Sequence, residues 1–275
     1  MSLLSQYPFL LTALLAGLLA SIGCGIMGSY VVVKRIGYLA GGISHSVLGG
    51  MGAALYFGFS PLLGALGAAL AAALAIGWIK LRWQTHEDTL IGALWAIGMS
   101  VGVLFIARTP GYATSLMSYL FGNILLVSEQ QLWQLAALDL LVLGLVAAFY
   151  RPFLAVSFDE EFARLRGVPV TFFYLLFLCL VALSVVLLVQ VVGLILVIAL
   201  LTLPAAIAAH HVQTLGTMMW LASLLGMLFT LGGIALSWHW DLPSGPVIIL
   251  VAGAGYLLSA LLGSWWRRRP LEPKA

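Results

Sequence analysis

Charged residues are scarce in this sequence. Only 8% of its 275 residues are Asp, Glu, Lys or Arg, whereas 63% are hydrophobic. Because a soluble domain has about 25% charged residues, this composition predicts an integral membrane protein surrounded by lipid bilayer. The apolar runs are long and do not alternate with polar residues, which favours helices over a β-barrel. The expected fold is all-α, a polytopic transmembrane helical bundle, with residues 1–275 forming a single domain.

Cysteines and enzyme motifs are equally scarce. The two cysteines, Cys24 and Cys179, lie in apolar runs and indicate neither a disulfide framework nor a metal cluster. No G-x-x-x-x-G-K-[ST] phosphate loop and no Gly-x-Ser-x-Gly elbow occurs. His86-Glu87 begins like a zinc-protease motif, but no second histidine follows at the required spacing. We therefore expect a chain that does no covalent chemistry of its own and binds no cofactor.

Acidic residues inside apolar runs are limited to Asp139. Proton-coupled and sodium-coupled transporters usually need several such groups. A secondary transporter of a small solute is therefore disfavoured, but it remains the main alternative to the function inferred below.

The apolar runs predict about eight or nine membrane crossings, since a spanning helix needs about 20 apolar residues. The candidate spans are 8–33, 38–58, 61–81, 89–107, 131–149, 170–190, 193–212, 217–238 and 245–266. The first is expected to be a retained span rather than a signal peptide. Residues 109–128 are predicted to form a re-entrant or interfacial segment.

The basic residues orient the predicted bundle. With nine spans, all but one of the basic clusters fall on the same side of the membrane, which the positive-inside rule assigns to the cytoplasm. These residues are Lys34, Arg35, Lys80, Arg82, Arg151, Arg164, Arg166 and Arg267 to Arg269, with Arg108 on the other side. The carboxyl-terminal tail, 267–275, is then cytoplasmic and the amino terminus lies outside.

The loop between the fifth and sixth spans predicts a short amphipathic helix at about 157–167. Phe158, Phe162 and Leu165 have helical spacing. Acidic residues at its start suit the positive end of a helix dipole, and Gly167 is expected to end it. One interpretation is a helix lying on lipid headgroups, although its acidic residues would face a negative leaflet. The preferred interpretation is a docking helix for a soluble partner.

The second span contains 41-GGISHSVLGG-50. On a helix, Gly41, His45, Gly49 and Gly52 share one face. One interpretation is a packing seam of small residues with one hydrogen-bonded histidine. The other is a face that lines an ion pathway, where His45 beside Ser44 offers a transient ligand. Both interpretations remain open from the residues alone.

Other polar residues are weaker candidates for the same pathway. His210 and His211 end the span 193–212 and are either interfacial side chains or exit ligands. His239 and Asp241 lie in an outer loop, where they are candidates for metal capture. Asp139 is either a buried, hydrogen-bonded polar group or a ligand.

Three ordered segments resemble the zinc/manganese-type permeases of ABC importers. Glu161, Ala163 and Gly167 have the spacing of the E-A-A-x-x-x-G coupling element, with Phe162 at the middle alanine. The segments are 159-DEEFARLRGVPV-170, 40-AGGISHSVLGG-50 and 191-VVGLILVIALLTLPAAIA-208, and the similarity extends along nearly the whole chain.

This resemblance implies a homodimeric permease in the bacterial inner membrane. Its implied partners are cytoplasmic ABC ATPase subunits, which bind the ATP, and an extracytoplasmic metal-binding protein; no nucleic acid is expected. The cargo would be Zn²⁺ or Mn²⁺, and a metal chelate remains an alternative. Zinc is favoured because histidines outnumber acidic residues along the expected path, whereas manganese prefers oxygen ligands. The residues implied to couple the permease to the ATPase are Asp159, Glu160, Glu161, Phe162, Ala163 and Gly167.

The chain departs from this family in the second span. Relatives often carry an aspartate four residues before the histidine, and this position is Gly41 here. A carboxylate and an imidazole one helical turn apart can share a metal ion, but this chain keeps only His45. The partner ligand of His45 is therefore left open.

Overall fold

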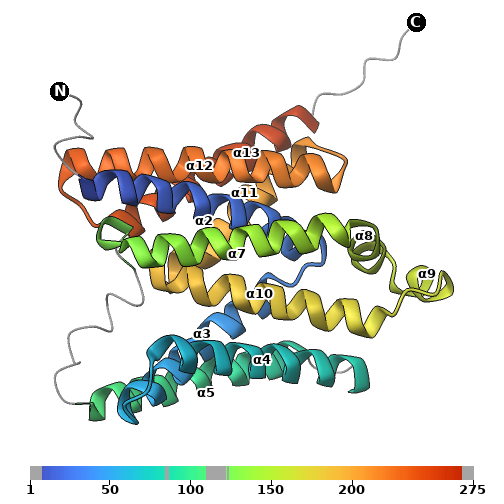
Figure 1. Ribbon diagram of the computed structural model, residues 1–275. Coiled ribbons are helices and arrows are strands. Elements are labelled where there is room, and N and C mark those ends of the chain that lie inside the picture. Colours follow the sequence, from blue (N-terminus) through green and yellow to red (C-terminus); the bar gives the residue numbers. More distant parts are fainter. Residues whose placement is uncertain (1–7, 84–86, 110–121, 123, 268–275) are drawn as a thin grey trace, which may run out of the picture.

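The computed structural model describes residues 8–83, 87–109, 122 and 124–267, which form helices and no strand within these ranges (Figure 1). The helices are α2 Pro8–Val33, α3 Gly37–Tyr56, α4 Pro61–Trp83, α5 Glu87–Arg108, the 3₁₀ turn η1 Ile124–Leu126, α7 Glu129–Ala148, α8 Tyr150–Phe158, α9 Glu160–Leu165, α10 Val170–Val192, α11 Leu194–His211, α12 Leu215–Trp240 and α13 Ser244–Arg267. The predicted all-α class is confirmed.

Eight of the described helices are long and apolar enough to cross a membrane, namely α2, α4, α5, α7, α10, α11, α12 and α13. The remaining predicted span, 38–58, corresponds to α3. This helix is long enough to cross a membrane but is less apolar, in mean hydropathy, than the other eight. Almost all of α3 between Leu39 and Ala54 is buried. Because α3 is surrounded by protein rather than lipid, its glycine, serine and histidine residues do not face hydrocarbon, where polar side chains would be costly.

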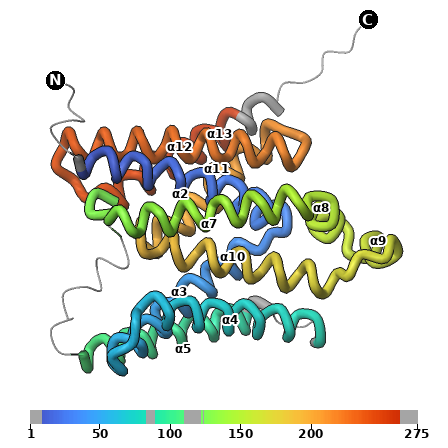
Figure 2. The backbone as a smooth tube through the Cα atoms, in the orientation of Figure 1, coloured from blue at the N-terminus to red at the C-terminus, as the bar shows by residue number. Residues whose placement is uncertain are grey.

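The long helices lie side by side and alternate in direction (Figures 1 and 2). Helix α3 packs between α4 and α5, and these three form one side of the molecule. Helices α2, α11, α12 and α13 form the other side, and α10 contacts both α4 and α11. The short helices α8 and α9 lie at one end of the bundle, called here the α9 end.

Local sequence signals set two of the helix boundaries. Gly193 separates α10 from α11 with a φ of 84°, at the break predicted from the length of the apolar run. Ser128 starts α7 with a capping box, in which its hydroxyl accepts from the Gln131 amide. Most of the predicted re-entrant segment, 110–121 and 123, lies outside the described residues, as does the tail after residue 267.

The amphipathic helix predicted at 157–167 is divided in the structure, and this corrects its boundaries. Asp159 is extended, with φ −149° and ψ 102°, and separates α8 from α9. Its carboxylate accepts a hydrogen bond of 2.9 Å from the Phe162 amide, so it caps a new helix instead of continuing the old one. Phe158 consequently belongs to α8. Gly167, with a φ of 76°, forms the turn after α9, as expected.

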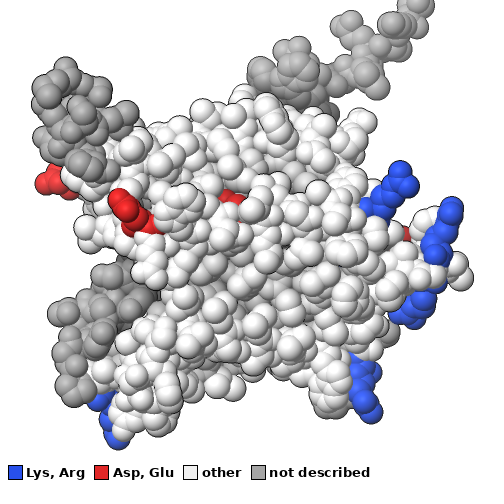
Figure 3. All heavy atoms as spheres, in the orientation of Figure 1, with Lys and Arg blue, Asp and Glu red and all other residues white. Residues whose placement is uncertain are grey.

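Lys and Arg side chains gather at the α9 end of the bundle (Figure 3). They come from the turn after α2, from the last turn of α4 and from the segment around α8 and α9. Arg108 ends α5 and lies at the opposite end. For the basic residues up to Arg166 that were expected on one side, the clustering therefore occurs in space, whereas Arg268 and Arg269 lie outside the described residues.

Candidate functional site

The glycines of α3 make backbone-to-backbone contacts on two sides. A methyl group placed on Gly49 would lie 2.7 Å from the carbonyl oxygen of Gly98 in α5. A methyl group on Gly50 would overlap the carbonyl oxygen of Gly64 in α4. Gly52 faces α5 in the same way as Gly49. These residues therefore form a packing seam between α3 and its two neighbours, because only glycine permits such an approach.

His45 lies within this buried helix and is 7% exposed. Its imidazole stacks on the Trp95 indole of α5, with ring centroids 4.2 Å apart and an interplanar angle of 14°. The buried Nδ1 atom of His45 has no hydrogen-bond partner among the described residues. Ser44, which is also buried, donates to the Ala40 carbonyl at 2.8 Å within its own helix. The structure thus leaves one imidazole nitrogen unpaired, whereas the hydroxyl hydrogen of Ser44 is already used.

Gly41 borders the same aromatic ring one turn before His45. A methyl group at Gly41 would lie 3.4 Å from Cζ3 of Trp95. Tyr38 adds a second ring, with its centroid 5.8 Å from that of Trp95. Trp95 therefore lies beside both Gly41 and His45. Over the described part of the chain, no three His, Cys, Asp or Glu side chains lie close enough to hold a metal ion.

Asp139 occupies a different place in the bundle. It is 4% exposed and faces α2, where a methyl group on Gly23 would lie 2.5 Å from Oδ1. Neither carboxylate oxygen has a hydrogen-bond partner among the described residues, so the expected hydrogen bond is absent there. Because Asp139 packs against α2 and His45 packs against α5, these two candidates belong to separate helix contacts.

The remaining candidate ligands are exposed. His210 and His211 end α11, and Nε2 of His211 lies 3.3 Å from the Ser259 hydroxyl of α13. His239 was expected in a loop but lies in the last turn of α12, because that helix continues to Trp240; Asp241 follows the helix in a left-handed conformation with a φ of 52°. The α12–α13 connection lies at the end opposite α9 (Figure 1). The candidate residues are thus distributed along the molecule rather than gathered in one site.

The residues expected to couple the chain to an ATPase lie in α9 or next to it. Ala163 is fully buried, whereas Phe158, Phe162 and Leu165 are 66%, 48% and 88% exposed. Glu160 pairs with Lys34 at 3.0 Å. Three exposed apolar side chains next to acidic residues form a surface, called here the α9 surface, of the kind that contacts a protein or a lipid surface.

Two residues at these sites were not identified from the sequence. Trp95 lies 50 positions from His45, and no local pattern connects them. In the sequence analysis, Lys34 was used only as one of the positive charges that orient the bundle. Its neighbour in space, Glu160, is 126 positions away, so only the tertiary structure reveals the pair.

Comparisons with known proteins cover nearly the whole chain. Residues 6–263 match the ABC 3 transport family. A probable metal transport system membrane protein of Chlamydia pneumoniae is 42% identical over 256 residues, 91% of this chain and 87% of that protein. The manganese transport system membrane protein MntC of Halalkalibacterium halodurans is 34% identical over 96% of this chain and 93% of that protein.

A solved structure has the same arrangement of helices. PsaBC from Streptococcus pneumoniae in complex with Fab matches with a TM-score of 0.84 and 30% identity. The match covers 93% of this chain and 92% of that one.

Proposed function

The chain belongs to the ABC 3 transport family, and from this premise we propose that it is the membrane permease of an ATP-driven importer of divalent metal ions. The whole-length similarity to proteins named for metal transport carries the proposal. The sequence has no phosphate loop, and in this proposal a separate ATPase subunit supplies the energy.

The α9 surface supports a contact with that ATPase. In this proposal the α9 end is cytoplasmic, in keeping with its basic residues. Phe158, Phe162 and Leu165 would become buried against the ATPase, with Asp159 and Glu161 at the rim. An interface with an apolar centre and a polar rim is the usual arrangement between proteins.

His45 is the proposed transient ligand on the pathway. Its Nδ1 atom is buried and unpaired among the described residues, so it would bind a metal only when it becomes accessible, and a homodimer would contribute two such imidazoles. A site with few ligands binds an ion weakly enough to release it, as transport requires. His239 and Asp241 would capture the metal at the outer end. His210 and His211 would receive it at the inner end, and Asp139 is the remaining candidate ligand.

Two metals have specific support. Zinc fits a site whose described ligand is an imidazole and whose Gly41 lacks a carboxylate. Manganese is supported by the similarity to MntC, a protein named for manganese transport. The cargo is therefore Zn²⁺ or Mn²⁺, and the chemistry at His45 favours zinc.

Transport by the purified complex tests this proposal. The permease and its ATPase are reconstituted in vesicles, and uptake of Zn²⁺ and of Mn²⁺ is measured with and without ATP. We expect ATP-dependent uptake, which His45→Ala and the similarly sized His45→Gln both reduce because each removes the ligand. Uptake that persists without the ATPase would favour a secondary transporter. Uptake of chelated metal alone would favour a chelate permease.

A further inference from the structure

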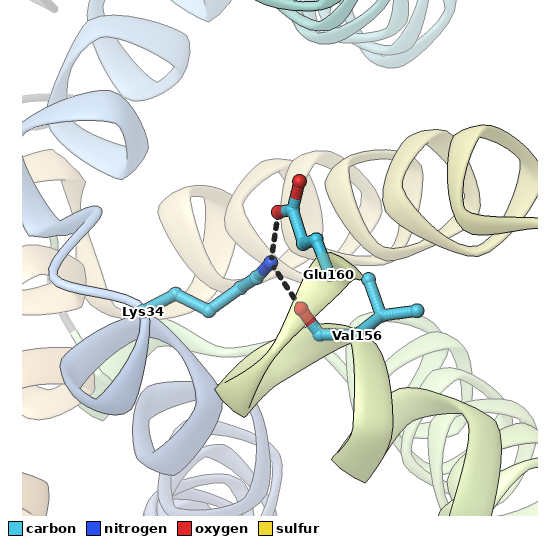
Figure 4. Close-up of polar contacts among 3 residues, drawn as sticks. All are labelled: Lys34, Val156 and Glu160. Carbon is cyan, nitrogen blue, oxygen red and sulfur yellow. Dashed lines mark hydrogen bonds and ion pairs between the residues drawn. The ribbon is translucent and has the colours of Figure 1, made fainter. Parts of the chain in front are cut away.

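Lys34 connects the start of α3 to the junction between α8 and α9. Its side chain is only 7% exposed. The ammonium donates to the Val156 carbonyl at 2.9 Å and to the Glu160 carboxylate at 3.0 Å (Figure 4). Val156 lies in α8, and Glu160 is the first residue of α9. One side chain therefore holds both short helices at the break between them.

This pair differs from an ordinary surface ion pair because the Lys34 side chain is buried, whereas that of Glu160 is 39% exposed. Exposed pairs contribute little because water and salt screen them, whereas a buried charge requires partners. Burial lowers the pKa of the Lys34 ammonium, and the ion pair with Glu160 opposes this shift. Val156 belongs to the last turn of α8, where carbonyl groups lack helical partners. Loss of Glu160 would thus leave a buried ammonium with only part of its compensation.

Two further helices meet at the same place. The Lys34 ammonium lies 5.0 Å from the centroid of the Tyr174 ring in α10, and that of Lys80 lies 5.2 Å from the same centroid. Lys80 belongs to the last turn of α4. Cations within about 6 Å of an aromatic face are attracted to it. The ends of α2, α4 and α10 therefore converge beside the α8–α9 junction.

The turn between α2 and α3 is short and fully hydrogen-bonded. The Ile36 amide donates to the Val31 carbonyl at 3.0 Å, and the Arg35 amide donates to Val32 at 3.1 Å. Arg35 has a φ of 57°, which gives the turn the form that commonly closes a helix. Because α3 begins at Gly37 and is packed on two sides, a displacement of this turn moves α3 with it.

We propose that Lys34 is the positioning residue that transmits displacements of α9 to α3, by keeping the α8–α9 junction attached to the α2–α3 turn. This inference rests on the proposed function, in which the ATPase binds the α9 surface and α3 carries His45, and it adds that the ATPase displaces α9. Lys34 touches no cargo and acts through Glu160.

Charge reversal in the complete complex tests the connection. Lys34→Glu, Glu160→Lys and the double exchange are reconstituted with the ATPase, and the metal taken up per ATP hydrolysed is measured. The control is Arg35→Glu, the same charge change at the adjacent, exposed position. We expect each single reversal to lower the ratio by about fivefold. The double exchange should restore at least about half of the loss, and Arg35→Glu should stay within about twofold of the unmodified protein.

Two outcomes would overturn the inference, and they differ from failure of the proposed function. Single reversals that retain the normal ratio would show that Lys34 does not transmit the movement. If the double exchange restored the melting temperature but not the metal taken up per ATP hydrolysed, the Lys34–Glu160 pair would have only a structural role. If the unmodified complex transports metal, the proposed function stands whichever result the variants give. If it does not, both proposals fail.

A cross-link provides a measurement that does not depend on charge reversal. Lys34→Cys and Glu160→Cys are introduced together in a Cys24→Ala, Cys179→Ala background and joined with a short bis-maleimide. Because the two positions are proposed to move together, cross-linking should restore metal uptake. The cross-linked complex should take up several-fold more metal than the same double-cysteine complex treated with a monofunctional maleimide. Loss of uptake on cross-linking would show that α9 has to separate from the α2–α3 turn, and would overturn the proposal.

Discussion

Helices α3 and α9 are positioned by opposite means. Helix α3 is surrounded by α4 and α5, and its glycines bring backbone against backbone on two sides. Helix α9 has six residues, of which only Ala163 is buried. It is held by the Asp159 cap and by the pairing of Glu160 with Lys34. Steric fit therefore fixes α3, whereas a few polar contacts fix α9.

This difference indicates which of the two helices can be displaced more easily. Close packing leaves α3 little freedom to move on its own, so it moves together with α4 and α5. Helix α9 exposes large apolar side chains and has few buried contacts, which is typical of a segment of low local stability. In the proposed mechanism, a partner that binds α9 would shift it at low cost, and the contact of Lys34 with Glu160 would pass the shift to the packed helices.

The largest effect is expected from adding one methyl group to α3. Gly50→Ala would force a carbon atom against the backbone of Gly64. Because the backbone cannot move aside as a side chain would, we expect a loss of about 3 kcal/mol, the upper end for overpacking. Thermal unfolding of the purified protein in detergent measures this change.

Gly67→Ala is the matched control in α4. A methyl group at Gly67 would meet nothing within 4 Å, so it should leave stability unchanged or raise it by up to about 1 kcal/mol through helix propensity. Equal melting temperatures for the two variants would contradict the steric account of α3.

A smaller and more local effect is expected at the turn after α9. Gly167 has a φ of 76°, and a methyl group there would meet nothing within 4 Å. The cost of Gly167→Val is therefore backbone strain alone, about 1–2 kcal/mol. Gly167→Asn should cost less, because asparagine tolerates this conformation.

Two measurements separate this effect from that at Gly50. Hydrogen exchange of the amides in 160–168 should accelerate in Gly167→Val, and ATP-driven uptake should fall. The melting temperature of the whole bundle should stay the same. A lower melting temperature would place α9 within the cooperative unit that contains α3, and the contrast between the two helices would disappear.

Features that depend on neighbouring residues could be predicted from the sequence. The apolar runs gave the long helices, since each run is long enough to cross a membrane. The break before α11 followed from Gln190 and Gly193, and the end of α9 followed from Gly167. The gathering of basic residues at one end followed from the alternation of the spans.

Features that depend on distant residues could not be predicted. The apolar spacing of Phe158, Phe162 and Leu165 runs across the break at Asp159, so the pattern favoured one helix where the cap produces two. The composition of α3 left a packing seam and an ion pathway equally open, because the sequence does not show which helices lie beside it. The stacking of His45 on Trp95 likewise depends on how α3 meets α5.

The smallest effect is expected at the start of α9. Asp159→Ala removes the carboxylate that accepts from the Phe162 amide, which should destabilise α9 by about 1 kcal/mol. Asp159→Asn is the control, because its side-chain oxygen can keep the cap. Since Asp159 is exposed, neither variant should change the melting temperature of the bundle.

Hydrogen exchange at Phe162 and affinity for the ATPase measure the outcome. Asp159→Ala should increase the exchange rate and weaken binding, because a frayed α9 has to be ordered before it binds. Unchanged exchange would mean that the Lys34–Glu160 pair alone defines the start of α9. Helix α3 has no equivalent weakness, because Ile36 precedes it without any side-chain cap. Its start is set by the hydrogen-bonded turn from α2 and by burial between two helices, so removing a single polar group cannot loosen it.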